Sequence, residues 1–191
     1  MKVERLQGAA LDAALPDLAR LRITVFRAFP YLYDGDLAYE ENYLRSYAEN
    51  PDAVLIAARD GDRIVGAATG MPLAAHADAS QLTGVLPPVD QVFYCAESVL
   101  LPEYRGHGLG HAFFDQREAE ARAQGFRYTL FCGVVRPADH PLRPEGYQPL
   151  DGFWRKRGYE KAEGVTAVFH WTDLGDAEET PHVLQAWIRE L

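Results

Sequence analysis

Residues 99–111, with the sequence VLLPEYRGHGLGH, decide the fold. They close an apolar run from Val92 to Leu101, which predicts a buried strand, and they open a run from Gly108 to Gln124, which predicts a helix. Glycine at positions 106, 108 and 110 permits positive φ angles and close approach of a ligand to the backbone. Because the first N–H groups of a helix converge and attract anions, this turn predicts a diphosphate site. A tight turn that binds nothing is the less favoured alternative.

Helices and strands alternate along the rest of the chain. The turn Asp60-Gly61-Asp62 between two apolar runs indicates a β-hairpin, and Thr180-Pro181 is typical of a helix start. We expect strands at residues 3–7, 53–58, 64–68, 92–101, 126–135, 159–163 and 165–171. We expect helices at residues 11–29, 37–49, 108–124, 150–157 and 180–191. This order predicts an α/β or mixed α+β fold in three layers, with helices flanking one mixed sheet.

Size and composition bound the class of protein. The chain has 191 residues, 48% of them hydrophobic, and no internal repeat or linker, so we expect a single domain over residues 1–191. Its net charge of -9 argues against binding to nucleic acid or to an anionic membrane. No apolar run reaches the roughly 18 residues of a membrane span, and the first residues lack a signal-peptide core. Cys95 and Cys132 give no disulfide framework, so we expect a cytoplasmic protein.

The spacing of the glycines excludes two other phosphate-binding loops. The dinucleotide pattern G-x-G-x-x-G requires glycine at position 111, where this chain has His111. The pattern G-x-x-x-x-G-K-[ST] is absent, so a nucleotide-dependent enzyme is a remote alternative. What remains is Arg105-x-x-Gly108-x-Gly110 at the end of a strand.

That pattern resembles the coenzyme A signature of the GNAT acyltransferases, R/Q-x-x-G-x-G/A. Residues 102–110, PEYRGHGLG, match it closely, and residues 153–159, FWRKRGY, resemble the family's second landmark, an aromatic-rich helix that runs into Gly-aromatic. The order of predicted elements also agrees, so the resemblance covers nearly the whole chain. It implies a GNAT-like three-layer fold with a splayed central strand, and an acetyl-CoA-dependent N-acetyltransferase.

The resemblance also implies where acetyl-CoA lies. Its pantetheine amides pair with the strand backbone around Ser98, Val99 and Leu100, and a backbone N–H near Val99 stabilises the developing oxyanion. The amine of a second substrate attacks the thioester directly. A homodimer is a further family expectation. The expected diphosphate ligands are the N–H groups of Arg105, Gly106, His107, Gly108, Leu109, Gly110 and His111.

Two residues are candidates for moving protons. Alternation along the central strand places Glu97 on one face with Phe93 and Cys95, so burial is expected to raise the pKa of a carboxylate that acts as general base. A carboxylate paired with an arginine beside a strand kink is an equally weighted alternative. Relatives have a tyrosine where this chain has Trp154, so Tyr147 is the candidate general acid, although it can also be a loop aromatic that covers the cofactor.

The sequence does not name the acceptor, but two segments border its expected site. Tyr31 and Tyr33 can wall a pocket, although rings that pack helices on the sheet are somewhat favoured. In the proline-rich loop, Arg136 and Arg143 can hold a carboxylate and His140 can position an amine. We therefore expect a small-molecule amine or an amino-acid-like acceptor.

Two alternatives complete the sequence interpretation. His107 and His111 stand four residues apart, but the Glu of a zinc peptidase helix is missing between them, so we expect no metal. A non-catalytic acyl-CoA sensor stays open because Trp154 replaces the usual tyrosine.

Overall fold

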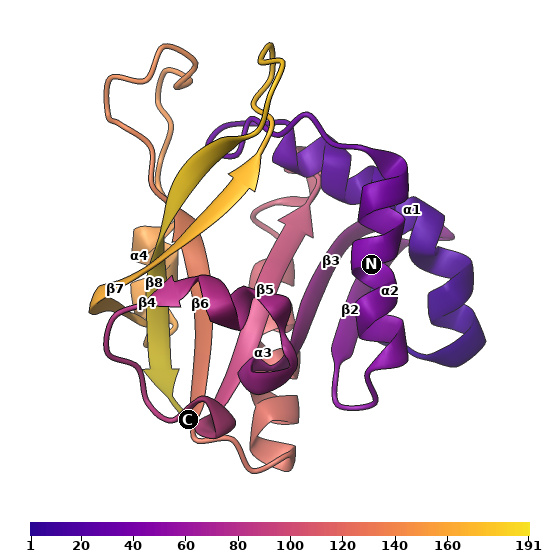
Figure 1. Cartoon of the computed structure of the whole chain (residues 1–191). Coiled ribbons are helices and arrows are strands. Elements are labelled where there is room, and N and C mark those ends of the chain that lie inside the picture. Colours follow the sequence, from indigo (N-terminus) through magenta and orange to yellow (C-terminus); the bar gives the residue numbers. More distant parts are fainter.

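A computed structural model describes the whole chain, residues 1–191, as one sheet with helices on both faces (Figure 1). In this view α1 and α2 lie in front of the sheet and α3 lies behind it. The helices are α1 (Gly8–Phe26), α2 (Leu37–Glu49), α3 (Leu109–Ala123) and α4 (Asp151–Lys156). The strands are β1 (Lys2–Leu6), β2 (Val54–Asp60), β3 (Arg63–Pro72), β4 (Leu82–Thr83), β5 (Val92–Leu100), β6 (Tyr128–Val134), β7 (Glu160–Trp171) and β8 (Thr180–Glu190). The predicted mixed α/β class is confirmed.

The sheet separates at its centre. Its strand order is β1-β2-β3-β5-β6-β8-β7-β4, and every neighbouring pair is antiparallel except β5 and β6. These two parallel strands pair only where Val92–Tyr94 faces Tyr128–Leu130. Beyond that point they diverge, and a cleft lined by both strands opens between them. The splayed central strand implied by the resemblance is present.

A β-bulge interrupts β5 where the two strands part. Two β5 residues between Tyr94 and Glu97 face one residue of β3, and this extra residue reverses the alternation of side chains. Glu97 consequently contacts Arg22 of α1. The expectation that Glu97 shares a face with Phe93 and Cys95 is wrong, because period-two alternation cannot anticipate a bulge.

The C-terminal segment is a strand, not the helix expected at residues 180–191. β8 lies between β6 and β7, paired with both. Its buried residues are His182, Leu184, Ala186 and Trp187, and the first three recur at every second position, which is the period of a strand. The signal of Thr180-Pro181 was misread, because pairing with two neighbouring strands overrides a local preference for a helix start.

β7 is also a single strand and not the hairpin expected from residues 159–163 and 165–171. Gly164 has a φ of 71°, but the chain continues in the same direction, and the register with β8 shifts between Lys161 and Thr166. The glycine therefore marks an irregularity within the strand and not a reversal of the chain. None of the helices is both long and apolar enough to span a membrane.

Candidate active site

The turn before α3 presents a row of unpaired backbone N–H groups. Gly106 and Gly108 have φ angles of 81° and 80°, in the left-handed region that favours glycine. The N–H groups of residues 106–111 have no acceptor within the protein, and the first helical bond runs from the Ala112 N–H to the Gly108 carbonyl at 3.1 Å. The expectation that the Arg105 N–H binds the diphosphate is wrong, because it donates to the Pro102 carbonyl at 3.1 Å. A Cβ at Gly106 or Gly108 would meet nothing within 4 Å. The turn is therefore open, and it can donate several hydrogen bonds to an anion.

A cavity of about 570 Å³ joins this turn to the cleft between β5 and β6. We call it the cofactor-side cavity. Its walls come from the turn, the free edge of β5, β6 and α4. Among the expected residues, it is lined by Tyr31, Glu97, Ser98, Leu100, Arg105, Gly106, Gly108, Gly110, His111 and Tyr147, and not by Val99, His107 or Leu109.

The free edge of β5 offers the backbone groups of alternate residues. The Leu101 N–H donates to the Val65 carbonyl of β3 at 3.0 Å. Because backbone groups alternate in direction along a strand, the Val99 N–H also points toward β3, and those of Ser98 and Leu100 point into the cleft. The Arg105 Nε donates to the Leu100 carbonyl at 3.3 Å, which agrees with this direction. Of the three expected residues, Ser98 and Leu100 can pair with a ligand, whereas Val99 is used by the sheet.

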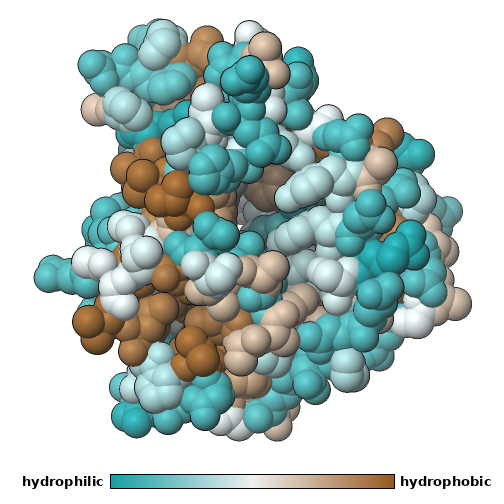
Figure 2. Space-filling view, in the orientation of Figure 1, coloured by the Kyte–Doolittle hydropathy of each residue, from teal (hydrophilic) through white to brown (hydrophobic).

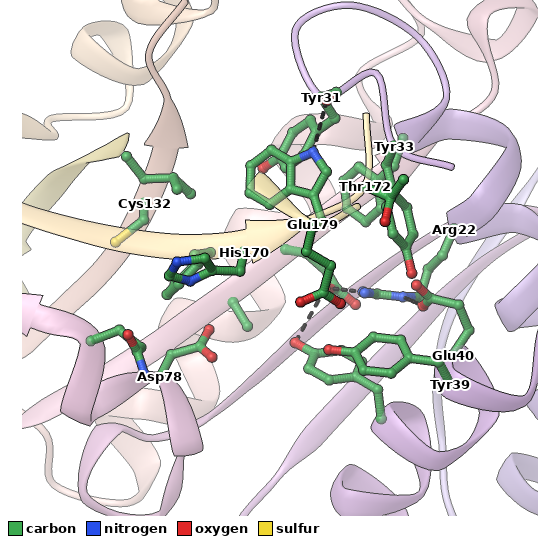
Figure 3. Close-up of a pocket in the computed structure, with 18 of the residues that line it drawn as sticks. Arg22, Tyr31, Tyr33, Tyr39, Glu40, Asp78, Cys132, His170, Thr172 and Glu179 are labelled. Carbon is green, nitrogen blue, oxygen red and sulfur yellow. Dashed lines mark hydrogen bonds and ion pairs between the residues drawn. The ribbon is translucent and has the colours of Figure 1, made fainter. Parts of the chain in front are cut away.

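A second cavity, of about 530 Å³, lies between α1, α2 and β7 (Figure 3). We call it the acceptor-side cavity. Figure 2 shows a hollow near the middle of this face of the molecule, bordered largely by hydrophilic surface. The residues that line both cavities are Phe26, Tyr31, Ala96, Glu97 and Cys132. The two cavities therefore meet at the β5 bulge, beside the Glu97 carboxylate.

Arg22 holds two buried carboxylates at this meeting point. Its Nη1 contacts Glu97 and its Nε contacts Glu40, and all three side chains are less than 10% exposed. Burial alone lowers the pKa of Arg22, but the charges of Glu97 and Glu40 outweigh it and raise the pKa well above the usual value. Glu97 is therefore paired with an arginine, which is the alternative that the sequence analysis left open. Since one guanidinium faces two carboxylates, the site keeps a negative charge.

A chain of hydrogen bonds leads away from Glu97. The Tyr43 hydroxyl donates to Glu97 Oε2 at 3.4 Å, Tyr47 and Tyr43 share a hydrogen bond of 2.9 Å, and Tyr47 and His76 Nε2 share one of 2.8 Å. The Asp78 N–H donates to His76 Nδ1 at 3.0 Å, so the neutral ring carries its proton on Nε2. Burial lowers the pKa of His76, which favours this neutral form.

Tyr147 and Trp154 border the cofactor-side cavity in different ways. The Tyr147 ring meets Phe29 edge-on at 4.7 Å, and burial raises its pKa, so the phenol keeps its proton at neutral pH. Trp154 packs on Phe131 and Trp187, each at a centroid distance of 5.0 Å. Its indole fills space in the core and supplies no hydroxyl. The phenols that line this cavity are those of Tyr31 and Tyr147, and Tyr147 is the one that does not also line the acceptor-side cavity.

Comparison with known proteins decides the family. The sequence model of the acetyltransferase (GNAT) family matches residues 18–144, which is more than half of the chain. The chain belongs to the GNAT family. No curated protein sequence matches it.

Solved structures agree with the GNAT fold. Ribosomal-protein-alanine N-acetyltransferase from Brucella melitensis has a TM-score of 0.66 at 14% identity, with 100% of both chains covered. A putative acetyltransferase from Salmonella typhimurium with acetyl-CoA has a TM-score of 0.64 at 10% identity, with 100% of this chain and 94% of that chain covered. PaiA N-acetyltransferase from Thermoplasma acidophilum in complex with coenzyme A has a TM-score of 0.56 at 11% identity, with 100% of both chains covered. At these identities the likeness is one of fold.

The expected acceptor residues of this GNAT domain divide into two groups. Tyr31 and Tyr33 line the acceptor-side cavity. Arg136 does not, because its guanidinium forms a two-bond pair with Asp173 at 2.8 Å and donates to the carbonyls of Pro30 and Tyr31. Four of its five N–H groups are thereby used, so Arg136 anchors the 31–33 segment and is not free for a substrate carboxylate.

The other two loop residues also lie elsewhere. The guanidinium carbon of Arg143 lies 5.0 Å from the Tyr147 ring centre, and the His140 ring is 5.7 Å from that of Phe29. Neither Arg143 nor His140 lines the acceptor-side cavity. The prediction that they hold the acceptor fails, because the loop folds over the cofactor side of the molecule.

Sequence reasoning missed the residues that give the acceptor-side cavity its charge. Arg22, Glu40, Asp78 and Glu179 come from α1, α2, a turn at Ala77–Gln81 and the chain before β8. No local motif links such distant positions. A polar residue within the apolar side of a predicted helix, as Arg22 is, was the one available signal.

Proposed function

We propose that this GNAT protein transfers an acetyl group from acetyl-CoA to the amine of a small molecule, by direct attack in a ternary complex. The observation that carries the proposal is the junction of two cavities at the β5 bulge. One cavity reaches the unpaired N–H groups before α3, and the other is lined by carboxylates and aromatic rings. A thioester lying along the free edge of β5 meets an amine from the other side beside Glu97.

The chain's own residues supply the steps of acetyl transfer. Glu97 takes a proton from the attacking amine as the C–N bond forms and the thioester carbonyl becomes an oxyanion. The cleft-facing N–H group of Ser98, next to Glu97, is placed to donate to that oxyanion, and that of Leu100, two residues further along the strand, is placed to pair with the pantetheine chain. As the C–S bond breaks, Tyr147 gives its proton to the departing thiolate and is reprotonated from solvent.

The ionisation of Cys132 argues for direct attack and against a thioester on the enzyme. Cys132 lines both cavities and is the thiol at their junction. Burial raises its pKa to about 12, so the thiol keeps its proton at neutral pH. Since the thiolate is the nucleophilic form, Cys132 is a poor acyl acceptor.

The hydrogen bonds behind Glu97 support its role as base. With Asp78 N–H fixing the His76 tautomer, donors can align from His76 through Tyr47 and Tyr43 toward the Glu97 carboxylate. This alignment orients the carboxylate.

A thiol-release assay with acetyl-CoA and a broad panel of amines tests the proposal. Turnover with at least one amine supports the transferase. Calorimetric binding of acetyl-CoA with no thiol release for any amine would instead favour the sensor. Cytoplasmic location and a homodimer stay predictions from sequence and family.

A further inference from the structure

We infer that the acceptor is a diamine or a polyamine, which carries a second ammonium group besides the amine that is acetylated. The inference rests on the proposed function and concerns the half of the site that binds the second substrate. It is drawn from three features of the acceptor-side cavity: its charge, one buried carboxylate oxygen without a partner, and its aromatic walls.

The cavity is strongly acidic. The single guanidinium in its lining is that of Arg22, which already contacts two carboxylates. Figure 3 shows Asp78 on one side of the cavity, Arg22 and Glu40 on the other, and Glu179 between them in this view. The carboxylates that line the cavity are Asp34, Asp36, Glu40, Asp78, Glu97 and Glu179.

Not all of these carboxylates have partners within the protein. Asp34 pairs with Arg27, and Asp36 caps α2 by accepting the Tyr39 N–H. Glu179 is exposed and forms no ion pair or hydrogen bond. It therefore offers a free negative charge at the cavity.

The buried carboxylate of Glu40 is a further feature of the cavity. Its side chain is fully buried, and although Oε2 contacts Arg22, Oε1 accepts no hydrogen bond. A buried carboxylate oxygen without a donor is costly, so the cavity is suited to a ligand that brings one. Burial raises the pKa of Asp78, and the neighbouring charge of Glu97 adds to that shift, as expected where negative charges gather without enough cations.

The remaining lining is aromatic. Such rings attract ammonium groups over their faces and pack against methylene chains. At about 530 Å³, the cavity lies within the range of small-ligand sites and has room for a chain of several carbons. The aromatic residues are Phe26, Tyr31, Tyr33, Tyr39, Tyr43, Tyr94, Phe169 and Trp171.

This lining distinguishes between classes of amine. Glu97 at the junction takes the reacting nitrogen, so Glu40, Asp78 and Glu179 are left to face the rest of the acceptor. A monoamine leaves Asp78 and Glu179 without a cationic partner from the ligand, and Glu40 with only its share of Arg22. An amino acid brings a carboxylate, and Arg22 is already shared by two carboxylates.

The experiment measures kcat and KM for acetyl transfer to putrescine, spermidine, n-butylamine and γ-aminobutyrate. We expect kcat/KM for putrescine or spermidine to be at least tenfold that for n-butylamine, with γ-aminobutyrate the poorest acceptor. In Glu179→Gln we expect KM for the polyamine to rise severalfold, with KM for n-butylamine unchanged. The matched control is Glu178→Gln, because Glu178 is also exposed but does not line the cavity.

The outcomes separate this inference from the proposed function. Turnover of n-butylamine or γ-aminobutyrate equal to that of both polyamines overturns the inference and leaves the transferase standing. Absence of thiol release for every amine overturns the transferase. In that case calorimetry of spermidine with the CoA-bound protein decides whether the cavity binds polyamines: loss of binding in Glu179→Gln but not in Glu178→Gln supports it, and no binding to the unaltered protein rejects it.

Discussion

The two cavities are similar in size, about 570 and 530 Å³, but they are made from different parts of the chain. One end of the cofactor-side cavity is a single continuous turn that presents unpaired backbone N–H groups, so its glycines can be recognised in the sequence. The acceptor-side cavity uses side chains from both N-terminal helices, a 3-10 turn and the C-terminal strands. A backbone site leaves a local motif, whereas a side-chain site assembled from distant segments leaves none.

The largest effect is expected at the junction, where the two cavities must cooperate. Glu97→Gln keeps the shape of the side chain but cannot take a proton from the amine. We expect kcat to fall on the order of 10²- to 10³-fold, the usual contribution of a general base. The Kd of acetyl-CoA, measured by calorimetry, should change little because the anion-binding turn is intact.

Glu49→Gln is the control for this charge removal, since Glu49 is an exposed residue of α2 that lines neither cavity. An equal loss of kcat in both variants, or a full rate in Glu97→Gln across the pH range, would remove Glu97 from the base role. Glu97 would then line both cavities without taking part in acetyl transfer.

The next largest effect is expected on CoA binding by the turn before α3. Gly108→Ala places a side chain at a φ of 80°, where a non-glycine residue costs about 1–2 kcal/mol. If the turn relaxes to avoid this cost, its N–H groups no longer converge, and we expect the Kd of CoA to rise about tenfold. Calorimetric titration with CoA measures the change.

Gly125→Ala is a matched control at the other end of the same helix. Gly125 has a φ of 83°, and a Cβ there would also meet nothing within 4 Å. The two variants should therefore lose similar thermal stability, but CoA binding should weaken only in Gly108→Ala. Equal weakening in both would mean that general helix stability, and not the turn, governs affinity.

A comparable loss, this time in kcat, is expected from Tyr147→Phe, which keeps the ring packed on Phe29 and removes the phenol proton. A thiolate is a fairly stable leaving group, so we expect kcat to fall only about tenfold, less than the roughly 10²-fold or more that is usual for general acid catalysis. The Kd of CoA should stay within twofold. If kcat is unchanged, the thiolate leaves without help from Tyr147, and the residue only covers the cofactor side.

The contrast between a local backbone motif and a site assembled from distant side chains also explains which features the sequence could predict. The residues 99–111 predicted the strand, the turn and the helix correctly, because each follows from local chemistry. The reversed face of Glu97 came from a bulge opposite β3, and the strand at Thr180–Glu190 came from pairing with β6 and β7. Arg136 was expected to bind a carboxylate and does so, but its partner is Asp173 of the same chain. Each failure is a non-local pairing.

A still smaller effect on kcat is expected from the hydrogen-bond chain that leads from Glu97 to His76. Tyr47→Phe breaks the hydrogen-bond chain between Tyr43 and His76. Loss of one such bond, worth about 1 kcal/mol, should lower kcat about fivefold if the chain orients Glu97. Tyr128→Phe is the control, because Tyr128 lies at the start of β6, lines neither cavity and has no hydrogen bond with this chain, so kcat should be unchanged. A kcat equal to that of the unaltered protein in both variants would show that the chain is only structural.

The smallest effect is a pH dependence of stability. Burial lowers the pKa of His76 and of His182 below the ordinary value of 6.5, so the folded state binds fewer protons than the unfolded state. Their contribution is therefore present above pH 6.5 and is lost as the pH falls below it, by at most about 1.4 kcal/mol per pH unit for each group. The pKa of Asp78 is raised from 3.8 by burial, which acts in the opposite sense above pH 3.8. Chemical denaturation at pH 7.5 and at pH 5.5 should show the loss of stability, and His76→Gln should reduce that loss. An equal loss in His76→Gln and in the unaltered protein would mean that folding does not lower the pKa of His76.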